Sequence, residues 1–528
     1  MSTLSHRHNG VFITIGLLVV AAMLAAVVVF TSGGASDVEL TTARFVPADA
    51  AVYVAFNTDL SSNQWVSTFR IIEKLGQKDP EKELKNSAGD QGGLDWEKEV
   101  APFLGGNAAI YAHGVSVADA SFQGAVILRC NDAKAALKVF LDQSGGTFEE
   151  TKYGGATYYR DAGMNLFAVR IDDHLVIAMD EISLKEAIDV HAGNKPALQS
   201  LSGFKNLRDE LTSDFLAFVY VNAGEFLGDT LFSDPIVKKA FDDAGASDLA
   251  LKPFAAVIGA KGYAFQFQAA SVGKIDAISP MIQPRKSRFA KVVPADTAIF
   301  FTTQNVAQTW NAVLKTAGKQ IDDAIAKDGQ YRNLRDALQA AGREVGLSSA
   351  QDLIDLFTGE MAVAGWFPKG NSEAPEFVVL AEVKDEAHAR DVLASVATAS
   401  AAKSQKPRTE TVGGAQVTLF TGTDGAVSAY AVKDGYMLIG SEEGVRKTLA
   451  GRSGNLADSA SYSATMKQMP GSLGTYAYLD MATILRLTGA DGVLPQLDEA
   501  DQALQGLILN YVQERGVARF SGVLSVKE

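Results

Sequence analysis

The sequence has little cysteine: Cys130 is the one cysteine among 528 residues. An intramolecular disulfide needs two thiols and a cysteine-based zinc site needs several, so both are excluded. Cys130 ends an apolar run at residues 124–130, which predicts a buried thiol that packs like a small apolar side chain. The competing role, a nucleophile, would require a positioned base beside it.

Histidine is scarce as well. His6 and His8 lie close to the N-terminus, the other four histidines fall in separate segments and no H-E-x-x-H pattern occurs, so no metal site is predicted. The tightest group of potential ligands is Asp172-Asp173-His174. Acidic residues between two apolar runs are typical of a tight turn, so we interpret this group as a turn.

Two short catalytic patterns are also missing. The sequence has no phosphate-binding glycine pattern and no G-x-S-x-G elbow, and residues 440–444 (GSEEG) have the wrong spacing for that elbow. Ser441 is instead predicted as a helix N-cap, with Glu442 and Glu443 in the first turn, where negative charge complements the helix dipole. No catalytic, cofactor-binding or metal-binding residue and no cofactor is therefore predicted.

Positive charge is sparse relative to negative charge. The formal net charge is −14 and no block of lysine and arginine compensates it, which disfavours binding to phosphate backbones. We therefore expect no nucleic-acid partner. Apolar residues make up 47% and charged residues 21% of the chain, as in ordinary folded proteins. The length exceeds what one hydrophobic core usually organises, which predicts at least two domains.

What the sequence does contain is one long apolar run, VFITIGLLVVAAMLAAVVVF, at residues 11–30. About 20 apolar residues are needed for a helix to cross a bilayer, so the run predicts a single transmembrane helix. Arg7 precedes the run, whereas Asp37 and Glu39 are the first charges after it. By the positive-inside rule, residues 1–10 lie in the cytoplasm and the bulk of the chain lies outside the cytoplasmic (inner) membrane.

A cleaved signal peptide is the alternative, because Gly33 and Ala35 could flank a cleavage site. The apolar run is longer than the roughly 7–15 residues of such peptides, which favours a retained signal anchor. No cysteine follows the run, so a lipoprotein anchor is excluded.

The remainder contains an internal repeat. Residues 46–53 (VPADAAVY) return as residues 293–300 (VPADTAIF), and each copy is followed by a tryptophan, Trp65 or Trp310. Later matches keep the same order along the chain. They are FLG with FTG (103–105, 357–359), GGA with GGA (154–156, 413–415), AV with AV (168–169, 431–432) and YVN with YLD (220–222, 478–480). Collinear matches predict a duplicated unit.

The predicted domains follow from this repeat. A linker at residues 31–42 leads into a first copy at residues 43–282, and a short linker at residues 283–287 leads into a second copy at residues 288–528. Residues 132–143 and 387–396 have the apolar spacing of amphipathic helices, with Asn131 or Asp132 as the N-cap of the first. Residues 156–160, 166–171 and 175–179 are rich in strand-forming residues and separated by turn signals.

Each copy is therefore predicted to be α+β: a mainly antiparallel sheet with helices packed on one face. The glycine pairs at 154–155 and 413–414 are predicted to form tight turns. The matched carboxylates Asp49 and Asp296 are interpreted as turn residues that accept a backbone N–H. The matched tryptophans Trp65 and Trp310 are interpreted as packing residues rather than a carbohydrate platform.

The Val-Pro-Ala-Asp-x-Ala motif, the Phe-x-Gly before residues 107–110 (NAAI) and the N-terminal apolar run resemble the bacterial family called domain of unknown function 3352. The likeness covers nearly all of the chain after the apolar run. It implies a membrane-anchored protein of the bacterial cell envelope. The family has no established activity, so no catalytic residue is carried over.

These observations predict a non-enzymatic, extracytoplasmic binding or envelope-associated module. We expect its partner to be an envelope protein or a small ligand, held in a groove between the two copies, because domain interfaces often form binding sites. A hydrolase with a site between the repeats is the alternative, and it would require a convergent pocket. A purely structural spacer is a third possibility.

Overall fold

The computed structural model describes residues 40–528 except 93–97, 99, 117–120, 144–146, 162, 164, 226–251, 274–278, 369–374, 401–405, 423–424, 452–453 and 489–502. The chain divides into two compact units. Unit 1 holds the described residues up to 225 together with residues 252–272, and unit 2 holds the described residues from 273 to 527.

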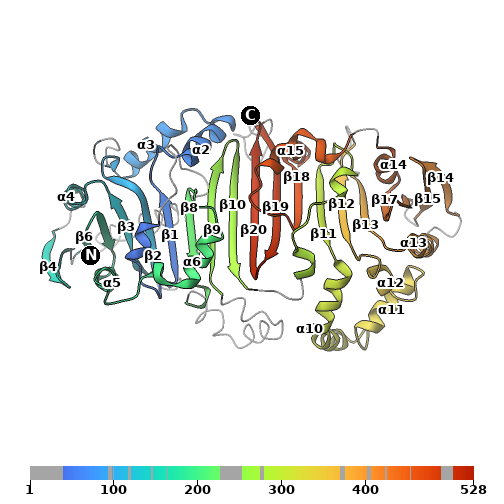
Figure 1. Cartoon of the computed structure of the whole chain (residues 1–528), viewed down its shortest axis with the longest axis horizontal. Coiled ribbons are helices and arrows are strands. Elements are labelled where there is room, and N and C mark those ends of the chain that lie inside the picture. Colours follow the sequence, from blue (N-terminus) through green and yellow to red (C-terminus); the bar gives the residue numbers. More distant parts are fainter. Residues whose placement is uncertain are drawn as a thin grey trace, which may run out of the picture. The chain divides into compact units, whose positions relative to one another are not determined.

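Unit 1 is built on an antiparallel sheet whose strands follow the order β4-β5-β6-β7-β3-β2-β1-β8-β9-β10 (Figure 1). The chain order of its elements is η1 (Thr41–Arg44), β1 (Val52–Asn57), α2 (Asn63–Lys74), α3 (Pro80–Gly92), β2 (Leu104–Ser116), β3 (Ser121–Cys130), α4 (Ala133–Gln143), β4 (Glu149–Tyr153), β5 (Ala156–Asp161), β6 (Leu166–Ile171), β7 (His174–Ala178), α5 (Glu181–His191), η3 (Leu198–Ser200), α6 (Ser202–Asp209), β8 (Ala217–Val221), β9 (Phe254–Lys261) and β10 (Ala264–Val272).

Unit 2 is likewise built on antiparallel strands, in the order β14-β15-β16-β17-β13-β12-β11-β18-β19-β20. Its elements are η4 (Ser279–Ile282), η5 (Phe289–Lys291), β11 (Ile299–Gln304), α10 (Val306–Asp328), α11 (Leu334–Glu344), α12 (Gln351–Ile354), β12 (Glu360–Trp366), β13 (Glu376–Glu382), α13 (Glu386–Ser400), β14 (Arg408–Val412), β15 (Ala415–Thr421), β16 (Val427–Lys433), β17 (Tyr436–Ser441), α14 (Glu442–Ala450), η6 (Leu456–Asp458), α15 (Ala460–Lys467), β18 (Thr475–Asp480), α16 (Met481–Thr488), β19 (Leu504–Glu514) and β20 (Val517–Val526).

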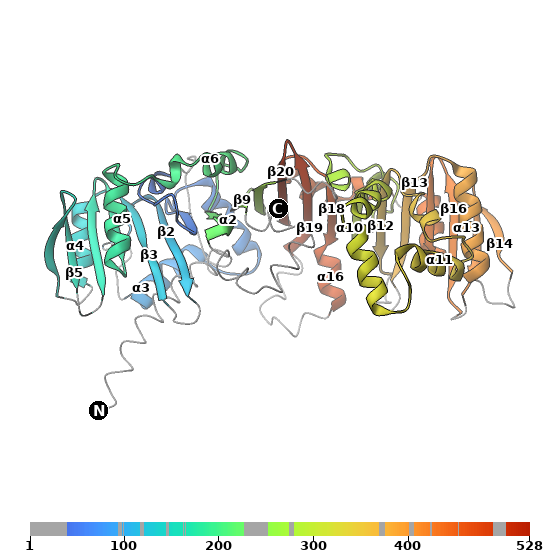
Figure 2. The ribbon, with the colours of Figure 1, turned by 90° about the horizontal axis from the view of Figure 1, so that it is seen from below.

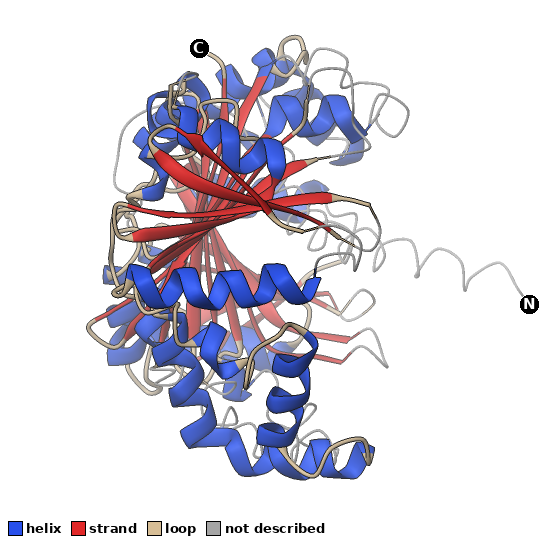
Figure 3. Ribbon diagram, turned by 90° about the vertical axis from the view of Figure 1, so that its right-hand side faces the viewer, coloured by secondary structure: helices blue, strands red, loops and turns tan. Residues whose placement is uncertain are grey.

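The α+β class and the antiparallel sheet are confirmed, but the prediction that helices cover one face is wrong. In unit 2, Ala381 of β13 packs with Leu393 of α13, whereas the neighbouring Leu380 belongs to the cluster that contains Val445 of α14. Successive side chains of a strand point to opposite faces, so α13 and α14 cover opposite faces of the sheet (Figure 3). The near-continuous apolar run of β13 requires this, because both of its faces are buried.

The same arrangement occurs in unit 1, where α4 and α5 flank the strands (Figure 2). Ala168 and Leu175 pack with α4, and their neighbours Val169 and Val176 are fully buried on the other face, where α5 contacts β6 and β7. Two helices on opposite faces make this part of each unit a three-layer structure.

The predicted tight turns are confirmed. Gly154 and Gly155 have φ angles of 56° and 83°, and residues 413–414 have 56° and 78°. Asp172 and Asp434 also have positive φ, 51° and 53°, at the turns that begin β7 and β17. Short hairpins need left-handed residues, which glycine adopts without strain and aspartate tolerates.

The predicted helix caps are confirmed as well. The carboxylate of Asp132 accepts from the backbone N–H groups of Lys134 and Ala135, at 3.1 and 3.0 Å, and so begins α4. Ser441 Oγ accepts from Gly444 N at 3.2 Å at the start of α14. Each cap satisfies a backbone donor that would otherwise lack a partner in the first helical turn.

None of the helices in the described part of the chain combines the length and hydropathy that a membrane span requires. The transmembrane helix predicted at residues 11–30 lies outside the described residues.

Residues 283–287, the predicted linker, make hydrogen bonds within unit 2. Gln283 O accepts from Gln304 Nε2 at 2.7 Å, and Arg285 N donates to Leu473 O at 2.7 Å.

Candidate functional site

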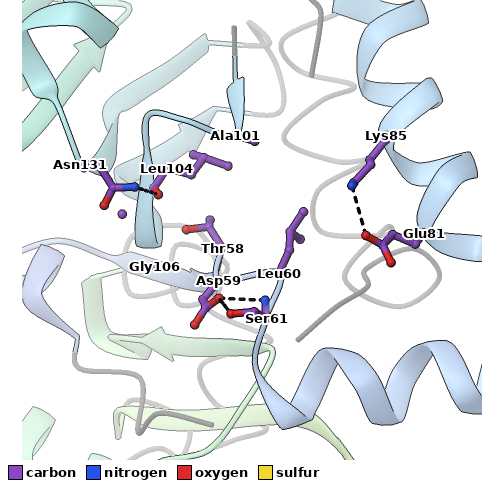
Figure 4. Close-up of a pocket in the computed structure, with 11 residues that line it drawn as sticks. Thr58, Asp59, Leu60, Ser61, Glu81, Lys85, Ala101, Leu104, Gly106 and Asn131 are labelled. Carbon is purple, nitrogen blue, oxygen red and sulfur yellow. Dashed lines mark hydrogen bonds and ion pairs between the residues drawn. The ribbon is translucent and has the colours of Figure 1, made fainter. Parts of the chain in front are cut away.

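Unit 1 contains an open cavity of about 560 Å³ at the end of β1 (Figure 4). Its walls come from the loop between β1 and α2, from α3, from the start of β2 and from the residue that follows β3. The lining residues are Thr58, Asp59, Leu60, Ser61, Glu81, Lys85, Ala101, Leu104, Gly105, Gly106 and Asn131. Its volume lies within the range of about 300–1,000 Å³ that is typical of small-molecule sites.

The loop between β1 and α2 is fixed by its own polar side chains. Asn57 Oδ1 accepts from Asp59 N at 2.9 Å, and Asp59 Oδ1 accepts from Ser61 N and Ser61 Oγ, both at 2.8 Å. Thr58 N also donates to Gly106 O at 3.0 Å, which holds the loop against β2. These hydrogen bonds organise the loop before any ligand binds, as a binding site on a loop requires.

A break in strand pairing forms the facing wall. The register between β2 and β3 shifts between Leu104 and Ala108, which is a β-bulge. Within it Gly106 has φ +98°, and a Cβ added there would meet no heavy atom within 4 Å. Because Gly106 has no side chain and the strand is kinked here, this wall leaves the cavity open. Bulges of this kind are over-represented next to binding and active sites.

Polar groups are placed around the cavity by three elements. Lys85 Nζ lies 3.1 Å from Glu81 Oε1 on α3, and Asn131 Nδ2 donates to Leu104 O at 2.8 Å (Figure 4). The buried hydroxyl of Thr58 has no hydrogen-bond partner among the described residues. An unpartnered buried hydroxyl costs about 1–3 kcal/mol, so a bound molecule or water that reaches it would stabilise the site.

Unit 2 has a different structure at the end of β11. There α10 begins at Val306, directly after Asn305, so no loop separates the strand from its helix. Asn305 N donates to Gly359 O at 2.8 Å, as Thr58 N does to Gly106 O in unit 1. The cavity beside Glu360 measures about 10 Å³, which is about the space of one water molecule. The connection between β1 and α2 is therefore longer than the connection between β11 and α10.

Glu360 and Arg285 line that small cavity, and the carboxylate of Glu382 accepts from Glu360 N at 2.8 Å. Glu360 is 2% exposed, and it accepts from Arg288 N and Thr302 Oγ1, both at 2.9 Å, and from Ser287 Oγ. Glu382 binds the guanidinium group of Arg285 at 2.9 Å. Partial burial alone would raise the pKa of Glu382, but the N–H of Glu360 and the guanidinium groups of Arg285 and Arg288 hold that pKa below its usual value. The pair is a structural ion cluster without room for a substrate.

The matched aspartates do not line the cavity. The Asp296 carboxylate accepts from Lys447 Nζ at 2.5 Å, and Asp49 lies 4.0 Å from His113 Nδ1. The interpretation that they accept a backbone N–H is not supported for either residue by the hydrogen bonds of the described structure. Their long-range partners are side chains on β2 and α14, which no local pattern identifies.

The Asp172-Asp173-His174 group is a turn with an ion network, as its sequence predicts. Asp173 lies 3.2 Å from Arg44 Nη2 and 2.7 Å from His174 Nδ1. Burial lowers the pKa of His174, although the contact with Asp173 acts in the opposite direction. No group of three or more potential metal ligands occurs in the described parts of the chain.

Cys130 and Trp65 are packing residues, as predicted. Cys130 is 4% exposed, and burial raises the pKa of its thiol to about 11, so the reactive thiolate is disfavoured. Trp65 is 1% exposed and its Nε1 donates to Asn57 O at 3.1 Å. Trp310 is half-buried and donates to Gln351 Oε1 at 3.0 Å.

Sequence reasoning missed the residues that do line the cavity. The string Asn57-Thr58-Asp59 before a helical pattern, and the doublet Gly105-Gly106 at the start of a strand, were available signals of a polar loop and a bulge. Neither signal indicates that the two segments meet. Among the described residues, His113, His174 and His191 each lie within 4.0 Å of a carboxylate.

Among known protein families, the one described as "Protein of unknown function (DUF3352)" matches residues 11–518. Comparison with curated proteins finds no match. Crystal form III of TP0453 is 11% identical, with a TM-score of 0.25 over 44% of this chain and 81% of that chain. Crystal form I of TP0453 is 13% identical, with a TM-score of 0.23 over 46% and 81%. Similarity at these TM-scores carries no conclusion about function.

Proposed function

The chain belongs to the DUF3352 family, and from this premise we propose that it is a membrane-anchored, extracytoplasmic binding protein. Its ligand is a small polar molecule that occupies the cavity of unit 1. The observation that carries this proposal is the preformed cavity of about 560 Å³ between the β1–α2 loop and the bulge of β2. Such concave sites with a few convergent polar groups are the usual form of a small-ligand site.

The proposed anchor is the apolar run at residues 11–30. The family match begins at residue 11, so the run lies within the part of the chain that the family matches. Thirteen of its twenty residues are Val, Ile, Leu or Phe, and together they contribute about −4 to −8 kcal/mol to membrane insertion. Arg7 on its amino side favours a cytoplasmic N-terminus, with units 1 and 2 on the opposite side of the inner membrane.

We also propose that the two units are copies of one α+β unit. Their strand orders correspond position by position, and each has its glycine turn, its N-cap aspartate or serine and its VPAD turn at matching places. Pro47 and Pro294 form isolated bridges with Ala197 and Asn455, which occupy equivalent places after α5 and α14. Under this proposal, one copy has gained a ligand cavity and the other has kept a compact strand-to-helix connection.

The residue types that line the cavity favour binding over catalysis. The described lining residues include hydroxyls, carboxylates, an amide and one ammonium group, but no histidine or cysteine. A serine or threonine nucleophile needs an adjacent base, and Ser61 Oγ is instead used to donate to the Asp59 carboxylate that shapes the loop.

A cavity-filling substitution tests the binding site. Ser61 is an exposed lining residue, and Ser61→Trp keeps the backbone N–H that bonds Asp59 while placing an indole in the cavity. We expect wild-type full-length protein in detergent to retain at least one compound from a defined mixture of sugars, amino sugars, amino acids and polyamines. The measurement is equilibrium dialysis followed by mass spectrometry, and Ser61→Trp should abolish retention.

The matched control is Ser348→Trp. Ser348 is also exposed and its hydroxyl also bonds an aspartate, Asp352, but it lies in unit 2 and does not line the cavity. This variant should retain the same compounds as the wild type. Retention of nothing by the wild type, or equal retention by Ser61→Trp, would contradict the proposed function.

The proposed orientation has its own test. A reporter enzyme that is active only outside the cytoplasm, fused after Glu528, should be active in cells. The same fusion to a chain from which residues 1–39 are deleted should be inactive and should no longer sediment with membranes. An inactive full-length fusion, or a full-length chain recovered in the soluble fraction, would overturn the anchor.

A further inference from the structure

We infer that the cavity of unit 1 selects an aliphatic amine cation. This inference rests on the proposed function, because it names the chemical class of the molecule that the same cavity binds. It depends on three properties of the described lining: the balance of charge, the balance of hydrogen-bond donors and acceptors, and the placement of apolar side chains.

The first property is charge. Among the described lining residues, Asp59 and Glu81 are carboxylates and Lys85 is the one cation, so the formal charge of the lining is two negative and one positive, or −1. Lys85 lies 3.1 Å from Glu81, so these two charges offset each other. The negative charge of the lining that no described lining cation offsets is therefore that of the Asp59 carboxylate. A cationic ligand is therefore attracted and an anionic ligand is repelled, in a chain whose net charge is −14.

The second property is that several lining donors are already used inside the protein. Thr58 N donates to Gly106 O, Ser61 N and Ser61 Oγ donate to Asp59 Oδ1, and Asn131 Nδ2 donates to Leu104 O. These bonds leave acceptors for a ligand. No described residue donates to Asp59 Oδ2 or to Asn131 Oδ1. The Thr58 hydroxyl, which can accept or donate, also has no partner among the described residues.

An ammonium group is the natural complement of such a site. It carries three donors and no acceptor, whereas a carboxylate or phosphate offers acceptors and would face a lining whose donors are largely occupied. Hydrogen bonds between an ammonium and a carboxylate are charge-assisted, so they are stronger than those of a neutral hydroxyl. The geometry of the lining therefore discriminates by charge as well as by hydrogen bonding.

The third property is the apolar part of the lining. Leu60, Leu104 and Ala101 stand among the polar groups, from the β1–α2 loop, the start of β2 and the segment before it (Figure 4). Methylene groups of a ligand can be buried against these side chains while its amine is held by the acceptors. A short aliphatic amine satisfies both surfaces, whereas a bare metal ion satisfies neither the apolar contacts nor the volume of about 560 Å³.

Three four-carbon compounds test the inference with the full-length protein in detergent at neutral pH. Putrescine, 1,4-butanediol and succinate share a chain length but carry amine, hydroxyl and carboxylate termini. In isothermal titration calorimetry we expect putrescine to bind, butanediol to bind at least about tenfold more weakly, and succinate not to bind.

Asp59→Asn supplies the matching variant. The substitution removes the charge but keeps Oδ1 as the acceptor for Ser61, so the loop should retain its shape. Putrescine binding should weaken by at least about tenfold. The control Asp209→Asn removes the same charge from an exposed position of α6, where Asp209 pairs with Arg208, and should leave binding unchanged.

The outcomes distinguish a failure of the amine inference from a failure of the proposed function. Equal binding of butanediol and putrescine, or unchanged putrescine binding by Asp59→Asn, overturns the amine inference while a cavity that binds small molecules stands. Failure of putrescine to bind, when dialysis shows another compound retained and lost in Ser61→Trp, also overturns only the amine inference. Failure of every compound in both experiments overturns both.

Discussion

Replacing Glu360 by alanine is expected to lower the free energy of unfolding of unit 2 by about 3–5 kcal/mol, because the carboxylate is a buried charge with several fixed partners. Glu360 accepts hydrogen bonds from Ser287, Arg288 and Thr302, and Arg285 lies 3.8 Å away. Its loss removes the acceptor of Ser287 Oγ and Arg288 N, whereas Thr302 Oγ1 keeps Met361 O at 3.2 Å, and it leaves part of the arginine charge without a counter-ion. Urea denaturation of the full-length protein in detergent, followed by peptide-resolved hydrogen exchange, measures the effect in the strands of unit 2.

Two further variants establish that burial is the reason. Glu360→Gln keeps an acceptor oxygen and should fall between the wild type and the alanine variant. Glu514→Gln breaks a partly exposed ion pair with Arg519, 3.0 Å away in the same unit, and should cost no more than about 1 kcal/mol. If Glu360→Ala and Glu514→Gln destabilised unit 2 equally, the carboxylate at position 360 would not have the structural role assigned to it.

Replacing Trp65 by alanine is expected to lower the free energy of unfolding of unit 1 by about 3–5 kcal/mol, because it removes a large, fully buried side chain and leaves a cavity. The indole is 1% exposed and donates to Asn57 O at 3.1 Å, which joins the first turn of α2 to the last residue of β1. The β1–α2 loop lies between these two anchors. The substitution should therefore also weaken retention of the ligand, and the same denaturation and dialysis measurements report both effects.

Trp310 provides the matched control in unit 2. It follows β11 as Trp65 follows β1, but it is only half-buried and bonds a side chain, Gln351, rather than the backbone. Trp310→Ala should cost no more than about 2 kcal/mol and should leave ligand retention intact. A larger loss for Trp310→Ala than for Trp65→Ala would contradict the assignment of Trp65 as the residue that fixes the loop.

Local features of both units could be predicted because their causes lie within a few residues. Asp132 and Ser441 cap the helices that follow them, and the glycine pairs at 154–155 and 413–414 adopt positive φ, since caps and tight turns depend on adjacent residues alone. Gly329, which follows Asp328, adopts φ 80° and ends α10.

Features that depend on distant pairs could not be predicted. The placement of helices on both faces required knowing that β13 lies inside the sheet, between β12 and β17. The partners of Asp49 and Asp296 come from other elements, and the carboxylates of Glu360 and Glu382 meet arginines that are 72 and 97 residues away along the chain. Such contacts are fixed by strand order and register, which short sequence patterns do not encode.

The amino-acid sequence determines the family, the α+β composition, the apolar segment at residues 11–30 and the local turns and caps, because each follows from composition, periodicity or neighbouring residues. The cavity of unit 1 depends on tertiary structure. It exists because a hydrogen-bonded loop at residues 58–62 meets a bulge at Gly105 and Gly106 across antiparallel strands, and because Asn131 and α3 close the same space. Only folding brings these segments together, so the cavity is a property of the tertiary structure and not of any one segment.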